Sequence, residues 1–148
     1  MKKSGFTMIE LIFVIVILGI LAAVAIPKMM ATRTNAKVVA MSQQVTSAIQ
    51  ELPSYVVSQG KVEDNMSKMS AVIQQLEASG LATVGTKEVT ISVDDGNGGT
   101  EDCIELKIVD GDKNLSIEHG SGTGAICKAI QDKIKEVKVP VGGQSVVF

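Results

Sequence analysis

The sequence has 148 residues, with 14 basic and 16 acidic side chains and a formal net charge of −2 at pH 7. This mildly acidic balance carries no basic footprint, so nucleic acid is not among the partners we expect. Trp is absent, and the chain has one Tyr and three Phe. Any globular core must therefore be aliphatic and rich in Met.

An apolar segment near the N-terminus dominates the sequence. It runs without a charge from Leu11 to Ile26 and, counted from Phe6, spans 21 residues. As an α-helix, such a segment extends about 31 Å, enough to cross a hydrocarbon core of about 30 Å. We therefore predict a membrane-spanning helix over 6–27.

The flanking charges predict the orientation of this helix. Lys2 and Lys3 lie on one side, which places the N-terminus in the cytoplasm and residues 28–148 on the exported side. An ordinary secretory signal is the alternative, because Ala23 and Ala25 form a small-residue cleavage pattern. The length of the apolar segment and the carboxylate of Glu10 both argue against that alternative.

Glu10 is an unexpected residue at the start of an apolar run. A carboxylate at the centre of a membrane helix costs about 2.5–3.5 kcal/mol on insertion scales and less near an interface. Two explanations remain open from residue type and depth. Either Glu10 lies shallow and is solvated by lipid headgroups, or another chain supplies a cation to it.

Gly19 and Pro27 weaken the same helix. Relative to Ala, Gly costs about 1 kcal/mol and Pro about 3 kcal/mol inside a helix, and Pro27 also removes the amide that would bond to the carbonyl of Ala23. From the residues alone, a routine transmembrane kink with no role in assembly is one explanation of both residues.

The N-terminal features form one continuous pattern. Lys2-Lys3-Ser4-Gly5 is followed by Phe6-Thr7-Met8-Ile9-Glu10 and then by the apolar run. This pattern resembles the class III signal of type IV pilins and type II secretion pseudopilins, and it covers residues 1 to about 35, a quarter of the chain.

The resemblance implies a processing step and an assembly step. A prepilin peptidase would cut between Gly5 and Phe6, releasing the leader 1–5, and would methylate the new amine of Phe6. The apolar helix would then pack in the core of a filament, where Glu10 pairs with the Phe6 amine of a neighbouring copy. The stretch from Gly19 to Pro27 would unwind as subunits are drawn into the filament.

The resemblance also implies partners and a location. The partners would be copies of the chain itself, the prepilin peptidase, an inner-membrane assembly platform and minor pilins or pseudopilins. The chain would cross the bacterial inner membrane once, with a periplasmic C-terminal domain, and would then join a type II secretion pseudopilus or type IV pilus-like filament in the periplasm or at the cell surface. The alternative is a single-pass, membrane-anchored periplasmic binding module that does not polymerise.

Two helices are predicted in the first half of the 28–148 domain. An apolar stripe continues the membrane helix over 28–60, with Pro53 bending or interrupting it and Gly60 ending it. The stripe consists of Val38, Met41, Val45, Ala48, Leu52 and Tyr55. A second helix over 61–81, capped by Asp64 or Asn65 and ended by Gly80, has its own core stripe. That stripe consists of Met66, Met69, Ile73 and Leu76.

The second half of the domain changes to a period of two. Alternating segments around Ile91, Leu106 and Leu115 predict antiparallel strands over 87–119. Asp110-Gly111 predicts a tight hairpin between the last two strands. A helix over 125–136 and an edge strand over 144–148 complete an α+β, pilin-like fold, in which one long helix packs on a small antiparallel sheet with one or two extra short helices.

Cys103 and Cys127 both lie in the exported part. In an oxidising compartment we expect a disulfide, with two free buried thiols as the alternative. Two Cys and the lone His119 do not make a zinc set. His119 also lacks a nearby nucleophile motif, and we expect no enzymatic activity.

Two loops could bind ions. Asp94, Asp95, Asn97 and Asp102 supply oxygen atoms of the kind that calcium prefers, but their spacing does not match an EF-hand, so a solvated hairpin loop is the main interpretation. The resemblance keeps calcium as a weak alternative, because some secretion pseudopilins bind it in a loop. The Gly-rich stretch 120–124 is interpreted as a connector before a helix, with an anion cradle as the alternative. No other cofactor is predicted.

Overall fold

The computed structural model describes residues 5–142. The chain divides between Ala36 and Lys37 into two compact units. Helix α1, Met8–Gln59, begins in the first unit and ends in the second. In the first unit it is the principal element, and its large apolar side chains from Leu11 to Ile26 are 45–71% exposed.

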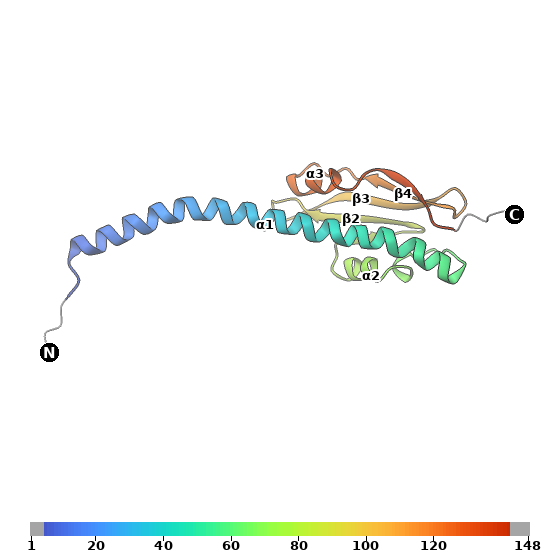
Figure 1. Ribbon diagram of the computed structural model, residues 1–148, viewed down its shortest axis with the longest axis horizontal. Helices are drawn as coiled ribbons and strands as arrows, with labels where there is room; N and C mark the ends of the chain where they lie inside the picture. Colours follow the sequence, from blue (N-terminus) through green and yellow to red (C-terminus); the bar gives the residue numbers. More distant parts are fainter. Residues whose placement is uncertain (1–4, 143–148) are drawn as a thin grey trace. The chain divides into compact units, whose positions relative to one another are not determined.

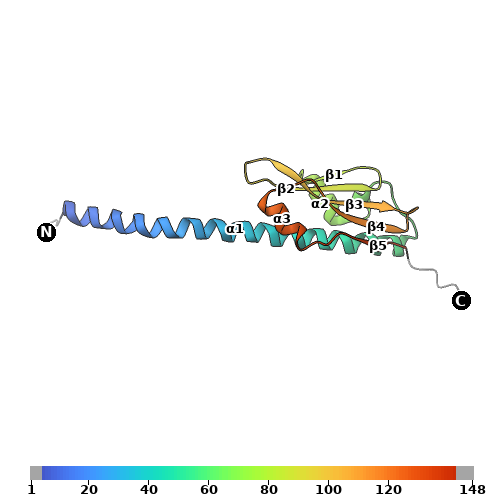
Figure 2. The same ribbon diagram turned by 90° about the horizontal axis from the view of Figure 1, so that it is seen from above.

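The second unit contains the C-terminal part of α1, which lies along a sheet (Figures 1 and 2). The predicted stripe forms its buried side, and Val45, Ala48 and Leu52 are completely buried. Pro53 does not interrupt the helix, which excludes one of the two predicted outcomes, bending or interruption. The helix continues for six residues to Gln59, because Leu52 and Val56 on either side of Pro53 are held in the core. Gly60, with φ 68°, ends it as predicted.

The second predicted helix is two shorter elements. A single 3₁₀ turn, η1, spans Met66–Lys68, and helix α2 spans Ala71–Ala78. Asn65 caps η1, and Ser70 caps α2 by accepting a hydrogen bond from the Ile73 amide. The interruption arises because Ser70 adopts extended backbone geometry and its hydroxyl competes for helix amides.

The C-terminal end of α2 and its contact with α1 are both specified by hydrogen bonds. The amides of Gly80 and Leu81 donate to the carbonyls of Glu77 and Leu76, which is the Schellman arrangement. At the other end, the Glu51 carboxylate of α1 accepts the Ser70 hydroxyl at 2.6 Å. An acid from one helix thus stabilises the N-terminus of the next.

Five antiparallel strands form one sheet in the order β1-β2-β3-β4-β5. Their bounds are Ala82–Val84, Glu88–Asp94, Thr100–Val109, Asn114–His119 and Val137–Pro140. The three central strands occupy the segments that alternate in the sequence. The two edge strands were not predicted, because β1 has three residues and β5 contains a proline.

The two faces of the sheet differ in polarity. Ile91, Ile104, Leu106 and Leu115 are completely buried in the core with α1 and α2. The alternate positions carry polar groups, including the Glu105–Lys107 ion pair of 2.6 Å. The predicted α+β class, with one long helix packed on a small antiparallel sheet, is confirmed.

Helix α3 is shorter than predicted. It spans Ala125–Gln131 and is followed by a turn and β5, where the sequence predicted helix to residue 136. Pro140 is tolerated because β5 is an edge strand, where a missing amide need not disrupt a ladder. The predicted strand over 144–148 lies outside the described residues.

Candidate processing and assembly site

The Gly5-Phe6 junction precedes α1 in a non-helical segment. The Phe6 side chain is 78% exposed. A Cβ placed on Gly5 would meet no heavy atom within 4 Å. The peptide bond at which the resemblance predicts cleavage therefore lies outside any helix or strand, next to an exposed side chain.

Thr7 and Glu10 form a reciprocal cap on the first turn of α1. The Glu10 carboxylate accepts the Thr7 amide at 2.8 Å and the Thr7 hydroxyl at 2.7 Å. In return, the Thr7 hydroxyl oxygen accepts the Glu10 amide at 3.3 Å. This is a capping box, in which an N-cap Thr and a Glu three residues later satisfy each other's amides.

The capping box gives Glu10 a role within its own chain. Neither of the two explanations drawn from the sequence included it, although Thr7-Met8-Ile9-Glu10 has the spacing of the motif. The carboxylate remains exposed on the helix, so it can also accept a donor from outside the chain. The bonds to Thr7 orient the carboxylate on the first turn of α1.

The apolar helix that follows needs a cover. None of the most apolar window of α1 is buried, and the helix is long and apolar enough to cross a membrane by length and composition. Water is an unfavourable solvent for such a surface, so lipid or other apolar helices must surround it. Gly19 has open space around its Cβ position. α1 is helical through both Gly19 and Pro27.

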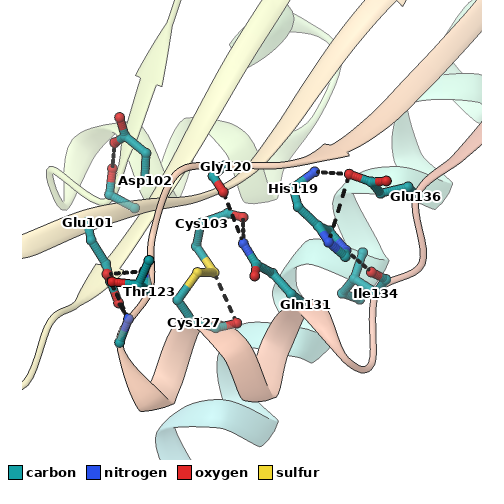
Figure 3. Close-up of a disulfide and its surroundings, with 12 residues drawn as sticks. Glu101, Asp102, Cys103, His119, Gly120, Thr123, Cys127, Gln131, Ile134 and Glu136 are labelled. Carbon is teal, nitrogen blue, oxygen red and sulfur yellow. Dashed lines mark hydrogen bonds and ion pairs between the residues drawn. A yellow bond between two sulfur atoms is a disulfide. The ribbon is translucent and has the colours of Figure 1, made fainter.

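A disulfide joins β3 to α3 in the second unit, as predicted (Figure 3). The Cα atoms of Cys103 and Cys127 are 5.4 Å apart, and both residues are completely buried. Ile91 pairs with Ile104 but Ser92 pairs with Asp102, so Cys103 is the extra residue of a β-bulge. Such a bulge redirects a side chain, and here it coincides with the Cys103 bond to α3.

The Gly-rich stretch 120–124 is a close-packed turn that binds an anion from its own chain. The Glu101 carboxylate accepts the amides of Thr123 at 2.8 Å and Gly124 at 3.0 Å (Figure 3). A Cβ on Gly120 would lie 2.5 Å from the Asp102 carbonyl oxygen. The sequence interpretation as a simple connector missed this close packing, and the anion alternative did not identify Glu101 as the occupant.

The acidic loop between β2 and β3 is anchored at both ends. Asp94 pairs with Lys37 of α1 at 2.5 Å. Asp102 accepts the Ser92 hydroxyl at 3.0 Å. One end of the loop thus already has a cation, supplied by the chain itself.

The middle of the acidic loop is held by its own amides. The Asp95 carboxylate accepts the amides of Asn97 at 2.7 Å and Gly99 at 3.0 Å. Among residues 5–142, no group of three or more His, Cys, Asp or Glu side chains is arranged to hold a metal. The three acids considered for calcium, Asp94, Asp95 and Asp102, therefore do not form such a group.

His119 connects β4 to the segment before β5. Its Nε2 atom lies 2.7 Å from the Ile134 carbonyl oxygen, and its amide donates to Glu136 at 3.0 Å (Figure 3). These contacts use the ring and the backbone for packing the end of the sheet.

Comparisons with known proteins agree with the N-terminal pattern. Residues 1–26 match the family model described as the prokaryotic N-terminal methylation motif. The chain is also similar to type II secretion system core protein G of Pseudomonas aeruginosa, with 31% identity over 74 residues. The resemblance to prepilin-type proteins is thereby confirmed.

The coverage of this similarity is partial. The matched region is 50% of this chain and 52% of the relative, so the chain spans about half the length of the curated relative it matches. No solved structure matches.

Proposed function

We propose that this chain is a structural subunit of a pseudopilin-type filament, cut after Gly5, methylated on Phe6 and assembled through α1. One observation carries the proposal. The methylation motif at residues 1–26 coincides with a helix whose apolar side chains are exposed along its length. A helix of this kind is stable in lipid as a precursor and among identical helices as a filament core.

The similarity to a core protein of type II secretion favours a pseudopilus over a type IV pilus. In this proposal the chain is an inner-membrane precursor with a cytoplasmic N-terminus and a periplasmic domain from residue 28. Its partners are a prepilin peptidase, an assembly platform, minor pseudopilins and further copies of itself. No catalytic step is assigned to the chain.

In this proposal the Glu10 carboxylate has a different donor in the precursor and in the filament. In the precursor it accepts hydrogen bonds from Thr7. In the filament it pairs with the Phe6 ammonium of a neighbouring copy, which fixes the axial register. A carboxylate and an ammonium attract strongly in a low dielectric, and removing one partner leaves the other charge uncompensated.

Substitution of Glu10 tests this proposal. We expect Glu10→Ala to insert into the membrane at wild-type levels, because it removes a charge from an apolar helix, and to form no filaments. The measurement is filament yield by electron microscopy, alongside the amount of protein in the membrane fraction. Normal filaments from Glu10→Ala would remove the assembly role of the carboxylate.

A membrane-anchored binding module remains the second reading. The second unit has an apolar groove of about 340 Å³, lined by residues that include Met41, Leu81, Val93 and Ile126. A pure anchor would require neither cleavage at Gly5 nor the carboxylate of Glu10. A chain that stays uncut at Gly5 in its native membrane would favour this anchored binding module over the filament subunit.

We further propose that the domain folds without a resident metal ion. The support is that Asp94 is paired with Lys37, while one carboxylate oxygen of Asp95 accepts two loop amides. Titration with millimolar calcium should leave the melting temperature unchanged. A rise in melting temperature that disappears in Asp95→Asn would instead assign a calcium site to the loop.

A further inference from the structure

The charged residues along α1 are distributed unevenly. Between Glu10 and Glu51 the chain has no acidic residue, and its three charged residues are all cations. These are Lys28, Arg33 and Lys37. Arg33 is the single arginine of the chain. A positive segment therefore directly follows the apolar helix on the side that the proposed function places outside the cytoplasm.

Depth separates these three cations. At about 1.5 Å per residue, Lys28 lies about 3 Å beyond Ile26, Arg33 about 10 Å and Lys37 about 16 Å. The headgroup layer adds about 5–8 Å on each side of the hydrocarbon core. Long basic side chains extend several ångströms back toward an interface. Lys28 and Arg33 can reach the phosphate layer, whereas Lys37 lies beyond it.

The ion pairs also separate Lys37 from Lys28 and Arg33. Lys37 is paired with Asp94 of the acidic loop. The ion pairs found among residues 5–142 include neither Lys28 nor Arg33. Both residues are exposed, with the Lys28 carbonyl accepting the Thr32 hydroxyl at 3.0 Å. Their positive charges remain available to an external anion.

We propose that Lys28 and Arg33 form a binding site for the phosphate groups of anionic phospholipids at the exported face of the membrane. The guanidinium of Arg33 matches a phosphate in a bidentate fashion, and the ammonium of Lys28 adds a point charge. The site rests on the orientation in the proposed function, with residues 28–148 outside the cytoplasm. It deepens that function by naming the lipid that the precursor contacts before assembly.

Removal of the leader changes which basic residues contact lipid. The leader carries Lys2 and Lys3, and after their loss the mature chain keeps no Lys or Arg on the cytoplasmic side of the helix. The remaining basic contacts with lipid are then those of Lys28 and Arg33. Entry into a filament must break these contacts, so anionic lipid holds the mature subunit at the exported face until it is extracted.

The lone arginine allows a direct test. The full chain, labelled with ¹⁵N in its arginine side chain, is placed in bilayers of phosphatidylcholine with or without phosphatidylglycerol. Solid-state NMR then measures dephasing of the guanidinium signal by lipid ³¹P, which comes from Arg33 alone. We expect faster dephasing when phosphatidylglycerol is present. Equal dephasing in the two bilayers would overturn the proposal.

Variants measure the lipid preference independently. Co-purified phosphatidylglycerol over phosphatidylcholine, counted by native mass spectrometry, should fall by about fivefold for each cation removed in Lys28→Gln and Arg33→Gln. Lys133→Gln in the second unit removes the same charge and should leave the preference unchanged. An equal loss in all three variants would reduce the effect to net charge and overturn the site.

Failure of this site can be distinguished from failure of the proposed function. Protease added outside sealed, right-side-out inner-membrane vesicles reports which side of the membrane residues 28–148 occupy, independently of lipid preference. If that domain is protected, the orientation in the proposed function is wrong. If it is digested and neither lipid measurement shows a preference, the phospholipid site is wrong while the filament proposal stands.

Discussion

Thr7 and Glu10 cap each other at the start of α1. The Glu10 carboxylate accepts the Thr7 amide at 2.8 Å, and the Thr7 hydroxyl oxygen accepts the Glu10 amide at 3.3 Å. The first turn of a helix otherwise leaves these amides unsatisfied, which is costly in an apolar environment. The acid therefore lowers the cost of beginning this apolar helix, whether or not it also has a partner in another chain.

Thr7→Val separates the cap from the assembly role that we propose for Glu10. The variant removes the hydroxyl but keeps the carboxylate, so we expect the first turn of α1 to lose about 1 kcal/mol of stability. Filaments should still form, at reduced yield. Backbone NMR of residues 7–11 in micelles measures the fraying, and electron microscopy measures the yield. Complete loss of filaments in Thr7→Val would show that the cap itself is required for assembly.

The disulfide stabilises the second unit. Cys103 and Cys127 are separated by 24 positions, and closing such a loop contributes about 3.5 kcal/mol on the chain-entropy estimate. We expect the double substitution Cys103→Ala and Cys127→Ala to lower the free energy of unfolding by about this amount. Chemical denaturation of the full chain in micelles provides the measurement.

Reductant gives an internal control for the disulfide. Dithiothreitol should lower the stability of the wild-type chain toward that of the double variant and leave the variant itself unchanged. A wild-type chain that is insensitive to complete reduction would show that the bond between β3 and α3 contributes nothing to stability.

The Gly-rich turn before α3 should be intolerant of side chains. A Cβ on Gly120 would lie 2.5 Å from a backbone oxygen, whereas one on Gly142 would meet nothing within 4 Å. Gly120→Ala should therefore cost about 1–3 kcal/mol through overpacking. Gly142→Ala is the matched control and should be neutral within about 0.5 kcal/mol. Equal melting temperatures for the two variants would contradict the close packing of this turn.

Acid should destabilise the second unit through carboxylates on the polar face of the sheet. The Ser116 hydroxyl, followed by the charge of Lys107, holds the pKa of Glu118 below its ordinary value of 4.5. A lowered folded-state pKa contributes stability above the unfolded value, and this contribution is lost as pH falls through the folded value. We expect the melting temperature to fall below about pH 4.5, with a shallower decline in Glu118→Gln.

The contribution of Lys107 to stability depends on pH in the opposite direction and is lost at alkaline pH. A hydrogen bond to Glu105 is the largest cause that raises the pKa of Lys107 above its ordinary value of 10.5. This contribution is fully present below pH 10.5 and is lost only as pH rises through the raised value. Between about pH 4.5 and pH 10.5, the protonation of Glu118 and Lys107 should therefore leave the free energy of unfolding nearly unchanged. A Glu118→Gln profile identical to wild type in acid would contradict the assigned role of Glu118.

The periodicity of the sequence predicted most of the second unit, because α1 and the central strands each bury a single face in the core. The stripe of α1 and the alternation of the three central strands place Leu52, Ile91 and Leu106 in the same core. These residues are buried by packing that follows directly from periods of 3.6 and 2. The disulfide followed from the exported context and the count of two Cys.

The elements that escaped prediction depend on contacts between distant segments. β5 is short and contains Pro140, and it becomes a strand because Leu115 and Ser116 of β4 pair with Val139 and Lys138. Glu101 lies more than twenty residues from the amides it binds, and no local pattern marks it. The Thr7-Glu10 cap, by contrast, has the local spacing of a capping box, so the sequence alone could predict it.

Mass spectrometry of the mature N-terminus tests the proposed function most directly. If the chain is a processed filament subunit, protein recovered from its native membrane should begin at Phe6, lack residues 1–5 and carry one methyl group on the Phe6 amine. An intact chain beginning at Met1, or one cut after Ala25, would contradict processing at Gly5 and with it the filament assembly through α1.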